Sequence, residues 1–273
     1  MKESFRVLHL SDLHYCSYFD HDGQYAAMLA RVSDPLTKAC DIIRKEQADV
    51  IVISGDLTDG GSAEDYAHVK RVLSDAAGDA VILPVLGNHD RKDSFRKGWL
   101  REAQTDASWH WRKEIGGFTF IGIDNSVFGV EDGYISDREI LWLQDALDDA
   151  RDVILCMHHP LKGKPGIEPL TNKERLLKAL DPYRSQIRMV LSGHTHWSDQ
   201  YVVDGIPCSS APSLSYRGVD EGDRVLFYDT CGFREYLLED HSVSVLKDVS
   251  EGGTLIGTLD MMQLQKELGK KTV

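Results

Sequence analysis

The chain has 273 residues, of which 42% are hydrophobic and 27% are charged. These proportions are typical of a folded globular protein that buries a substantial core, and they exclude a disulfide-stapled mini-protein, a disordered chain and a membrane bundle. The formal net charge of −13 repels polyanions, which disfavours a nucleic-acid polymer as the partner.

Six short apolar runs are predicted to be buried strands, because most of them are closed by polar residues or glycine. In chain order they are Phe5–Leu10, Val50–Ile53, Val81–Leu86, Phe118–Ile123, Val153–Met157 and Met189–Leu191. Four segments have helical patterns: Tyr25–Gln47, Ala63–Ala77, Asp137–Ala150 and Asn172–Leu180. Ser136 and Glu139 have the spacing of a capping box at the start of the third helix. This alternation predicts a layered α/β fold with its site at the carboxyl ends of the strands.

The pattern of apolar and polar residues changes after His196. Tyr201–Ile206 and Val225–Leu238 are typical of hairpin strands, with Gly205 and Gly232 at turns. We therefore expect one domain over residues 1–273, with its motifs in 5–197, strands of a second, more antiparallel sheet in 198–258 and a terminal helix in 259–271.

Cysteine usage and the chain's N-terminal residues bear on the compartment. The five cysteines are scattered and never spaced as CxxC, which disfavours a disulfide framework or a zinc knuckle and favours a reducing environment. Residues 1–4 lead straight into a strand-like run without an apolar signal segment, and no stretch approaches the length of a membrane span. We expect a cytoplasmic protein that does not associate with membranes, and the sequence leaves open whether it forms a homo-oligomer.

Side chains able to bind metals follow five of the six predicted strands. They are Asp12 with His14, Asp56, Asn88 with His89 and Asp90, His158 with His159, and His194 with His196. The i, i+2 pairs direct both side chains to the same side of an extended segment. A mixture of carboxylate, imidazole and amide ligands suits Mn, Fe or Zn. Glycines beside the ligands, Gly55, Gly87 and Gly193, allow sharp turns or close approach.

Each of these pieces alone has an ordinary structural explanation. Asp12 and His14 could form a turn with a surface histidine, and Asp56 could accept backbone N–H bonds in a turn. His158 and His159, which precede a proline, could be satisfied histidines at a chain reversal. All five pieces in order, each after an apolar strand, favour a dinuclear metal site instead.

These motifs make the chain resemble the calcineurin-like metallophosphoesterase family. The motifs are most similar to those of the class III cyclic-nucleotide phosphodiesterases. They are Asp12-Leu-His14, Gly55-Asp-Leu-Thr-Asp59, Gly87-Asn-His-Asp90, Met157-His-His-Pro160 and Gly193-His-Thr-His196. The resemblance implies a four-layer α/β/β/α sandwich of two mixed sheets flanked by helices. It covers the chain from Asp12 to His196, and the remainder matches no motif.

The resemblance also implies a role for each matching residue. It places Asp12, His14 and His196 on one metal ion, Asn88, His158 and His194 on a second, and Asp56 on both. Spacing alone does not choose between His158 and His159, and the family pattern selects the first. Asn88 and His89 would be catalytic, the histidine as the proton donor. The cofactor would be two metal ions per chain, Mn²⁺ and/or Fe, with Zn as an alternative.

Such a pair of ions implies hydrolysis of a phosphoester. Two cations about 3.5–4 Å apart would bind a hydroxide and lower the pKa of its parent water toward about 7. The hydroxide attacks phosphorus in line, and the ions, Asn88 and His89 stabilise the developing charge. Asp59 and Asp90 are candidates to orient neighbouring imidazoles. Tyr15 is a candidate substrate contact, whereas Trp99, Trp109 and Trp111 fit core packing better than a base-stacking wall.

The substrate we expect is a small phosphodiester, in particular a cyclic nucleotide. Protein phosphatases of the superfamily follow the bridging aspartate with Asp-Arg-Gly, but here Gly60 stands in the arginine's place. A guanidinium for the second charge of a monoester is thus missing, unless Arg217 supplies it. The alternatives are a phosphomonoesterase or protein phosphatase on the same scaffold, and a non-catalytic metal-binding scaffold. The complete ligand set argues against the scaffold.

Overall fold

A five-stranded sheet contains the first three strands of the chain. The structure is a computed structural model that describes residues 4–17, 23–262, 264 and 267. The strand order is β13-β12-β1-β2-β3, with β1 (Ser4–Leu10), β2 (Val50–Ser54), β3 (Val81–Val85), β12 (Cys231–Glu239) and β13 (Ser242–Glu251). The strands β1, β2 and β3 are parallel, and β12 runs antiparallel to β1. This mixed sheet thus pairs the first strand of the chain with a strand from its C-terminal third.

A six-stranded sheet faces the first one. Its order is β4-β5-β6-β7-β9-β8, with β4 (Trp111–Ile115), β5 (Phe118–Gly122), β6 (Val153–Cys156), β7 (Ile187–Ser192), β8 (Asp199–Val203) and β9 (Ile206–Ser210). Apolar side chains from both sheets, among them Val52, Val85, Phe120, Ile154 and Leu191, form one buried cluster. The two sheets therefore pack face to face.

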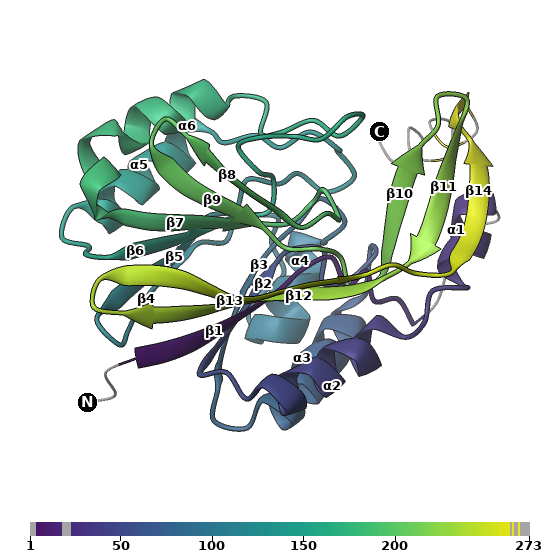
Figure 1. The fold of residues 1–273 in the computed structure, drawn as a ribbon, viewed down its shortest axis with the longest axis horizontal. Coiled ribbons are helices and arrows are strands. Elements are labelled where there is room, and N and C mark those ends of the chain that lie inside the picture. Colours follow the sequence, from purple (N-terminus) through teal and green to yellow (C-terminus); the bar gives the residue numbers. More distant parts are fainter. Residues whose placement is uncertain (1–3, 18–22, 263, 265–266, 268–273) are drawn as a thin grey trace.

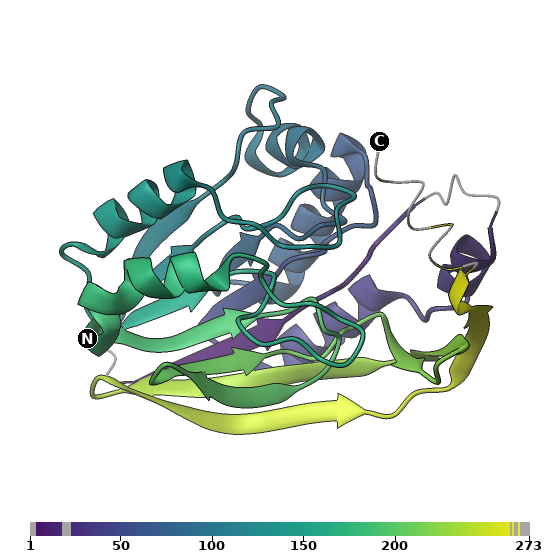
Figure 2. The same cartoon turned by 90° about the horizontal axis from the view of Figure 1, so that it is seen from above.

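Helices cover the outer face of each sheet (Figures 1 and 2). The six-stranded sheet packs against α5 (Asp137–Leu147) and α6 (Lys173–Leu180), and the five-stranded sheet against α2 (Pro35–Glu46) and α3 (Ala63–Ala77). A short α4 (Lys92–Phe95) leads into a π-helical turn at Arg96–Leu100, and a 3₁₀ turn at Asp181–Gln186 follows α6. The four-layer α/β/β/α sandwich expected from the resemblance is confirmed.

A third, three-stranded sheet stands beside the sandwich and was not predicted. Its order is β10-β11-β14, with β10 (Tyr216–Asp220), β11 (Arg224–Asp229) and β14 (Leu255–Asp260). The helix α1 (Gln24–Leu29) packs on it, and the two share a small apolar core. Figure 1 shows this unit at the right of the sandwich, with purple α1 beside yellow β14, so distant parts of the chain build it together.

Three of the four predicted helices need correction at their ends. Tyr25–Gln47 is two helices, because the Asp34 carboxylate caps a new helix by accepting from Leu36 N (3.1 Å) and Pro35 occupies its first turn. Ala63–Ala77 is helical over its full predicted length. The third helix begins at its Ser136 capping box, as predicted, but ends at Leu147, and the fourth begins after Asn172.

The predictions for the C-terminal third were partly wrong. Gly205 lies in the β8–β9 turn, where its φ is 80°. Gly232 lies inside β12 instead of at a turn; a Cβ there would come within 2.5 Å of Pro212 Cγ, so close packing explains this glycine. The strands of 198–258 also divide among all three sheets.

The predicted terminal helix begins too early. Leu259 belongs to β14, where it pairs with Val225, and residues 261, 262, 264 and 267 are helical. The rest of the predicted helix, at 263, 265–266 and 268–271, lies outside the described residues. Among the described helices, none is both long and apolar enough to cross a bilayer.

Candidate metal centre

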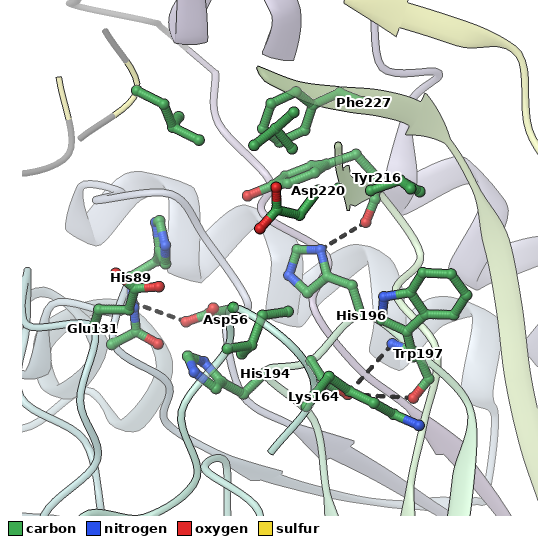
Figure 3. A pocket seen from close by; sticks show the side chains of 18 of the residues that line it. Asp56, His89, Glu131, Lys164, His194, His196, Trp197, Tyr216, Asp220 and Phe227 are labelled. Atoms are coloured by element: carbon green, nitrogen blue, oxygen red, sulfur yellow. Dashed lines mark hydrogen bonds between the residues drawn. The ribbon is translucent and has the colours of Figure 1, made fainter. Parts of the chain in front are cut away.

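The residues singled out in the sequence meet at one end of the sandwich. Each lies in the loop after a parallel strand: Asp12 and His14 after β1, Asp56 after β2, Asn88 and His89 after β3, His158 after β6, and His194 and His196 after β7. Parallel strands bring their carboxyl ends to the same edge, and the two facing sheets place these edges together. Figure 3 shows Asp56, His89, His194 and His196 around one cavity.

One group of converging atoms comes from Asp12, His14 and His196. Their nearest ligand atoms all lie within 4.8 Å of one another. His14 Nε2 lies 3.2 Å from His196 Nε2, and His196 Nε2 lies 3.4 Å from an oxygen of Asp12. Asp12 and His14 are buried and the His196 side chain is only 11% exposed, so solvent does not separate these atoms. The arrangement directs lone pairs at a shared point.

The Asp56 carboxylate lies between this group and a second one. Its Oδ2 is 3.5 Å from His14 Nε2 and 3.3 Å from His158 Nε2. His158 Nε2 also lies 3.1 Å from the amide oxygen of Asn88, and the His158 and His194 rings are 5.2 Å apart. A single carboxylate therefore contacts imidazoles from both groups.

Contacts behind the imidazoles set their orientation. His158 Nδ1 donates to the Ser54 carbonyl oxygen at 2.7 Å, and His196 Nδ1 donates to that of Tyr216 at 2.6 Å. A proton on Nδ1 leaves the Nε2 lone pair free to face the centre, which is the usual arrangement for a metal-bound histidine.

His159 takes a different position from His158. Its Nε2 pairs with the Glu131 carbonyl oxygen at 3.0 Å, and its ring lies 4.3 Å from that of His194. His158 is the one of the two that contacts Asp56 and Asn88. His158, His159 and His194 also have ligand atoms within 4.8 Å of one another, so contact with the Asp56 carboxylate is the feature that sets His158 apart.

The backbone at the centre is held in a costly conformation. Five residues have positive φ: Asp12 (53°), His14 (47°), Asp56 (49°), His194 (67°) and His196 (60°). Such conformations cost non-glycine residues about 1–3 kcal/mol each and persist where the surrounding structure enforces them, commonly at functional sites. Strain at these five positions therefore lowers the stability of the fold, and the same conformations direct the side chains toward the centre.

Three glycines allow the strand ends to approach one another closely. A Cβ on Gly87 would lie 2.1 Å from Asp56 Oδ1, and a Cβ on Gly193 would lie 1.9 Å from Ser11 Oγ. Gly55 also has φ 96°, with His158 Nδ1 2.4 Å from the position of a Cβ. Close approach is therefore the reason for glycine beside the ligands, as the sequence indicated.

Charge in the cluster is strongly coupled. Burial alone would raise the pKa of Asp56, but the imidazoles of His158 and His89 hold it well below its usual range. Burial opposes protonation of His158, yet the adjacent Asp56 carboxylate raises its pKa to about 9. Burial lowers the pKa of His14 to about 3 despite the nearby Asp56. Without bound cations, the proton on His158 therefore offsets the negative charge of Asp56, whereas His14 is neutral.

The donor set fits divalent transition ions. His194 Nε2 is buried without a hydrogen-bond partner, and the Nε2 atoms of His14 and His196 face each other. Hydrogen-bond acceptors left unpaired beside two buried carboxylates cost free energy of folding unless a bound cation interacts with them. Nitrogen and oxygen ligands together suit Mn, Fe or Zn.

His89 has its own oriented contact. Its Nδ1 lies 2.8 Å from Asp59 Oδ1, and its backbone N–H donates to Asp56 at 2.8 Å. Asp90, the other candidate for orienting an imidazole, does not do so: its carboxylate accepts from Leu57 N, Thr58 N, Gly87 N and the Tyr66 hydroxyl. Burial and Asp56 raise the pKa of Asp90 to about 7. Asp59 is therefore the orienting aspartate.

A cavity of about 720 Å³ opens from the centre. Asp56, Asn88, His89, His194 and His196 line its polar end, and residues of the three-stranded sheet line the other (Figure 3). The positively charged side chain of Lys164 also lines the cavity.

The sequence did not point to Tyr216, because no motif surrounds it; its ring lines the cavity between those of His196 (4.7 Å) and Phe227 (5.8 Å). Arg217 packs on Trp197, with its guanidinium 4.1 Å from the ring centroid. Trp99 and Trp111 are buried, which confirms core packing.

Comparison with known proteins gives a consistent result. A sequence model described as calcineurin-like phosphoesterase matches residues 5–198. The chain is 32% identical to a probable cyclic nucleotide phosphodiesterase of Rhodococcus erythropolis over 77% of this chain and 71% of that protein. It is 29% identical to a glycerophosphodiester phosphodiesterase of Enterobacter lignolyticus over 70% of each chain.

Solved structures share the fold at much lower identity. A purple acid phosphatase from yellow lupin aligns with a TM-score of 0.64 at 11% identity, covering 97% of this chain and 55% of that one. A dimetal phosphatase from Danio rerio aligns with a TM-score of 0.58 at 16% identity, covering 92% and 99%. These likenesses support the architecture of the sandwich.

Proposed function

The chain belongs to the calcineurin-like phosphoesterase family and is a hydrolase of phosphoesters, and from this premise we propose that it hydrolyses a small phosphodiester, in particular a cyclic nucleotide, at a centre of two metal ions. The observation that carries the proposal is the Asp56 carboxylate, which contacts His14 at 3.5 Å and His158 at 3.3 Å. Relatives of this chain carry names of cyclic nucleotide and glycerophosphodiester phosphodiesterases, which supports a diester substrate.

The metal ligands follow from the two groups of converging atoms. Asp12, His14 and His196 would hold one ion, and Asn88, His158 and His194 the other, with Asp56 shared by both. The imidazole contacts to Ser54 and Tyr216 support this assignment, because they turn Nε2 toward the centre. Mn²⁺ and Fe are the ions we propose, with Zn as an alternative.

The protein's own groups supply orientation and a proton. When bound, divalent ions supply positive charge that activates water and stabilises phosphoryl oxygens. The Asn88 amide lines the same end of the cavity, where its N–H₂ can donate to a phosphoryl oxygen. Asp59 accepts from His89 Nδ1, which directs Nε2 toward the cavity, and a protonated imidazole there donates to the departing ester oxygen.

Charge in the cavity favours a diester over a monoester. Within the described lining, Lys164 is the lysine and no arginine occurs, and Lys164 Nζ already pairs with Asp199 Oδ2 at 2.7 Å. Arg217 contacts Trp197 from outside that lining. A monoester dianion would therefore find little protein charge for its second negative charge, whereas a diester carries only one.

A hydrolysis panel with the Mn²⁺-reconstituted chain tests this proposal. We expect higher kcat/KM for bis(p-nitrophenyl) phosphate than for p-nitrophenyl phosphate, and hydrolysis of 2′,3′- or 3′,5′-cyclic nucleotides. Metal-stripped protein is the control and should be inactive until ions are restored. A strong preference for the monoester would favour the phosphatase alternative, and tight metal binding without any hydrolysis would favour the non-catalytic scaffold.

A further inference from the structure

We propose that the three-stranded sheet is the specificity wall of the cavity, and that it selects diesters whose substituent carries a planar apolar ring the size of a nucleobase. The specificity wall is the set of cavity-lining residues Tyr25, Tyr216, Val225, Phe227, Met261 and Leu264. This inference rests on the proposed phosphodiesterase function and adds which part of the ester the protein distinguishes. The wall lies almost entirely outside residues 5–198, which the family's sequence model matches.

The cavity has two chemically distinct ends. Amide and imidazole groups and the Asp56 carboxylate lie at the end beneath the sheet, whereas the end formed by β10, β11 and α1 consists mainly of rings and aliphatic side chains, with the Asp220 carboxylate beside them (Figure 3). A phosphoryl group can be satisfied only at the polar end. The substituent it carries must then extend along the cavity toward the specificity wall.

The distances between ring centroids give the order of the aromatic wall residues, counted outward from the metal ligands. The Tyr216 ring lies 4.7 Å from that of His196 and 5.8 Å from that of Phe227, and the Tyr25 ring lies 6.4 Å from that of Phe227. The Tyr216 carbonyl oxygen also accepts from His196 Nδ1, which ties β10 directly to the centre. Phe227 is thus one aromatic ring further out than Tyr216, where it meets the substituent and not the phosphate.

The wall presents carbon more than hydrogen-bonding groups. Its two tyrosine hydroxyls bond to each other, with an oxygen-to-oxygen distance of 2.5 Å. Against these six side chains, the hydroxyls of a glycerol substituent would lose water without gaining hydrogen-bond partners, which is unfavourable. A nucleobase instead buries its faces on aromatic and aliphatic side chains, and base stacking on aromatic rings contributes about 1–3 kcal/mol per base.

The size of the cavity and the position of Asp220 agree with this occupant. The cavity volume of about 720 Å³ lies within the range of roughly 300–1,000 Å³ that small-molecule and cofactor sites occupy. The turn at Lys164–Ile167 faces β10, and a Cβ on Gly166 would lie 3.3 Å from Asp220 Oδ2. Asp220 is thus a hydrogen-bond acceptor in the lining next to the wall, where a sugar hydroxyl can bond.

Two diesters with the same leaving group isolate the wall. Thymidine 5′-(p-nitrophenyl) phosphate and methyl p-nitrophenyl phosphate carry one charge each and release the same nitrophenolate, so they differ only in the retained substituent. We expect wild type to favour the thymidine ester in kcat/KM by at least about tenfold, in line with base stacking. Phe227→Leu, which keeps an apolar side chain but removes the ring, should lower this ratio at least about threefold.

A core substitution in the same sheet is the matched control. Ile256 shares the small apolar core with Phe227 but does not line the cavity, so Ile256→Val should leave the ratio unchanged. If Phe227→Leu fails to fold, Met261→Ala tests the same wall from another side. A wild-type ratio near one, or a ratio insensitive to both wall variants, overturns the wall while diester hydrolysis still stands.

A binding measurement separates failure of the wall from failure of the proposed function. If the Mn²⁺-loaded protein hydrolyses neither diester, the phosphodiesterase proposal is wrong. Calorimetry with thymidine 5′-phosphate and methyl phosphate then decides the wall by itself. Tighter binding of the thymidine compound by about tenfold supports it, and equal binding refutes it.

Discussion

Replacement of His89 by alanine tests the proton donor. His89 Nδ1 lies 2.8 Å from Asp59 Oδ1, its side chain is 16% exposed, and it lines the cavity. The imidazole is therefore already oriented, and no other element must move to place it. Loss of an oriented general acid typically costs about 10²–10⁴-fold in rate, which corresponds to roughly 3–5.5 kcal/mol in the barrier.

The size of this loss should depend on the leaving group. Nitrophenolate departs readily without a proton, so His89→Ala should cost bis(p-nitrophenyl) phosphate about tenfold or less, while a cyclic nucleotide with its alkoxide leaving group should lose about 10²–10⁴-fold. Asp59→Asn, which keeps the shape but removes the accepting carboxylate, should show the same pattern at smaller amplitude. His68→Ala is the control, because that histidine stacks on Tyr15 away from the cavity.

Initial rates and metal content together decide the role of His89. The rates come from nitrophenol absorbance and nucleotide chromatography, and metal content from elemental analysis of the same samples. Equal losses for both leaving groups would remove His89 from the acid role. Loss of metal would make it a ligand, an outcome the geometry permits because His14, Asp56 and His89 have ligand atoms within 4.8 Å of one another.

Three further predictions concern the centre and the core. Asp56→Asn should abolish turnover and lower the content of both metal ions, because the two groups share this carboxylate; two tightly held ions and near-normal activity would contradict it. Gly193→Ala should lower metal occupancy and cost about 1–3 kcal/mol in urea unfolding, since its Cβ would meet Ser11 Oγ at 1.9 Å; wild-type behaviour would refute the packing argument. Leu143→Ala, at 0% exposure, should cost about 2–5 kcal/mol, whereas Leu141→Ala, at 67% exposure, should change stability by less than about 0.5 kcal/mol.

Local sequence determined most strands and the residues of the centre. Runs such as Val50–Ile53 are buried on both faces of a sheet, so their composition alone identifies them. The side chains able to bind metals follow these strands directly, and the carboxyl ends of parallel strands necessarily share an edge. The helix ends were less certain, because the break at Pro35 depends on Asp34 capping a new helix and not on the apolar pattern.

Tertiary structure alone decided what surrounds the centre. His158 and His159 have the same local sequence environment, and only the position of Asp56 and Asn88 distinguishes them. The three-stranded sheet pairs strands near 220 and 260 and packs against the helix near 25, and contacts between such distant segments leave no periodic pattern in the chain. Tyr216 and Phe227 carry no motif, since an apolar wall is defined by the cavity it encloses. The sequence by itself thus determined the phosphoester chemistry, while tertiary packing determined the surface that lines the cavity.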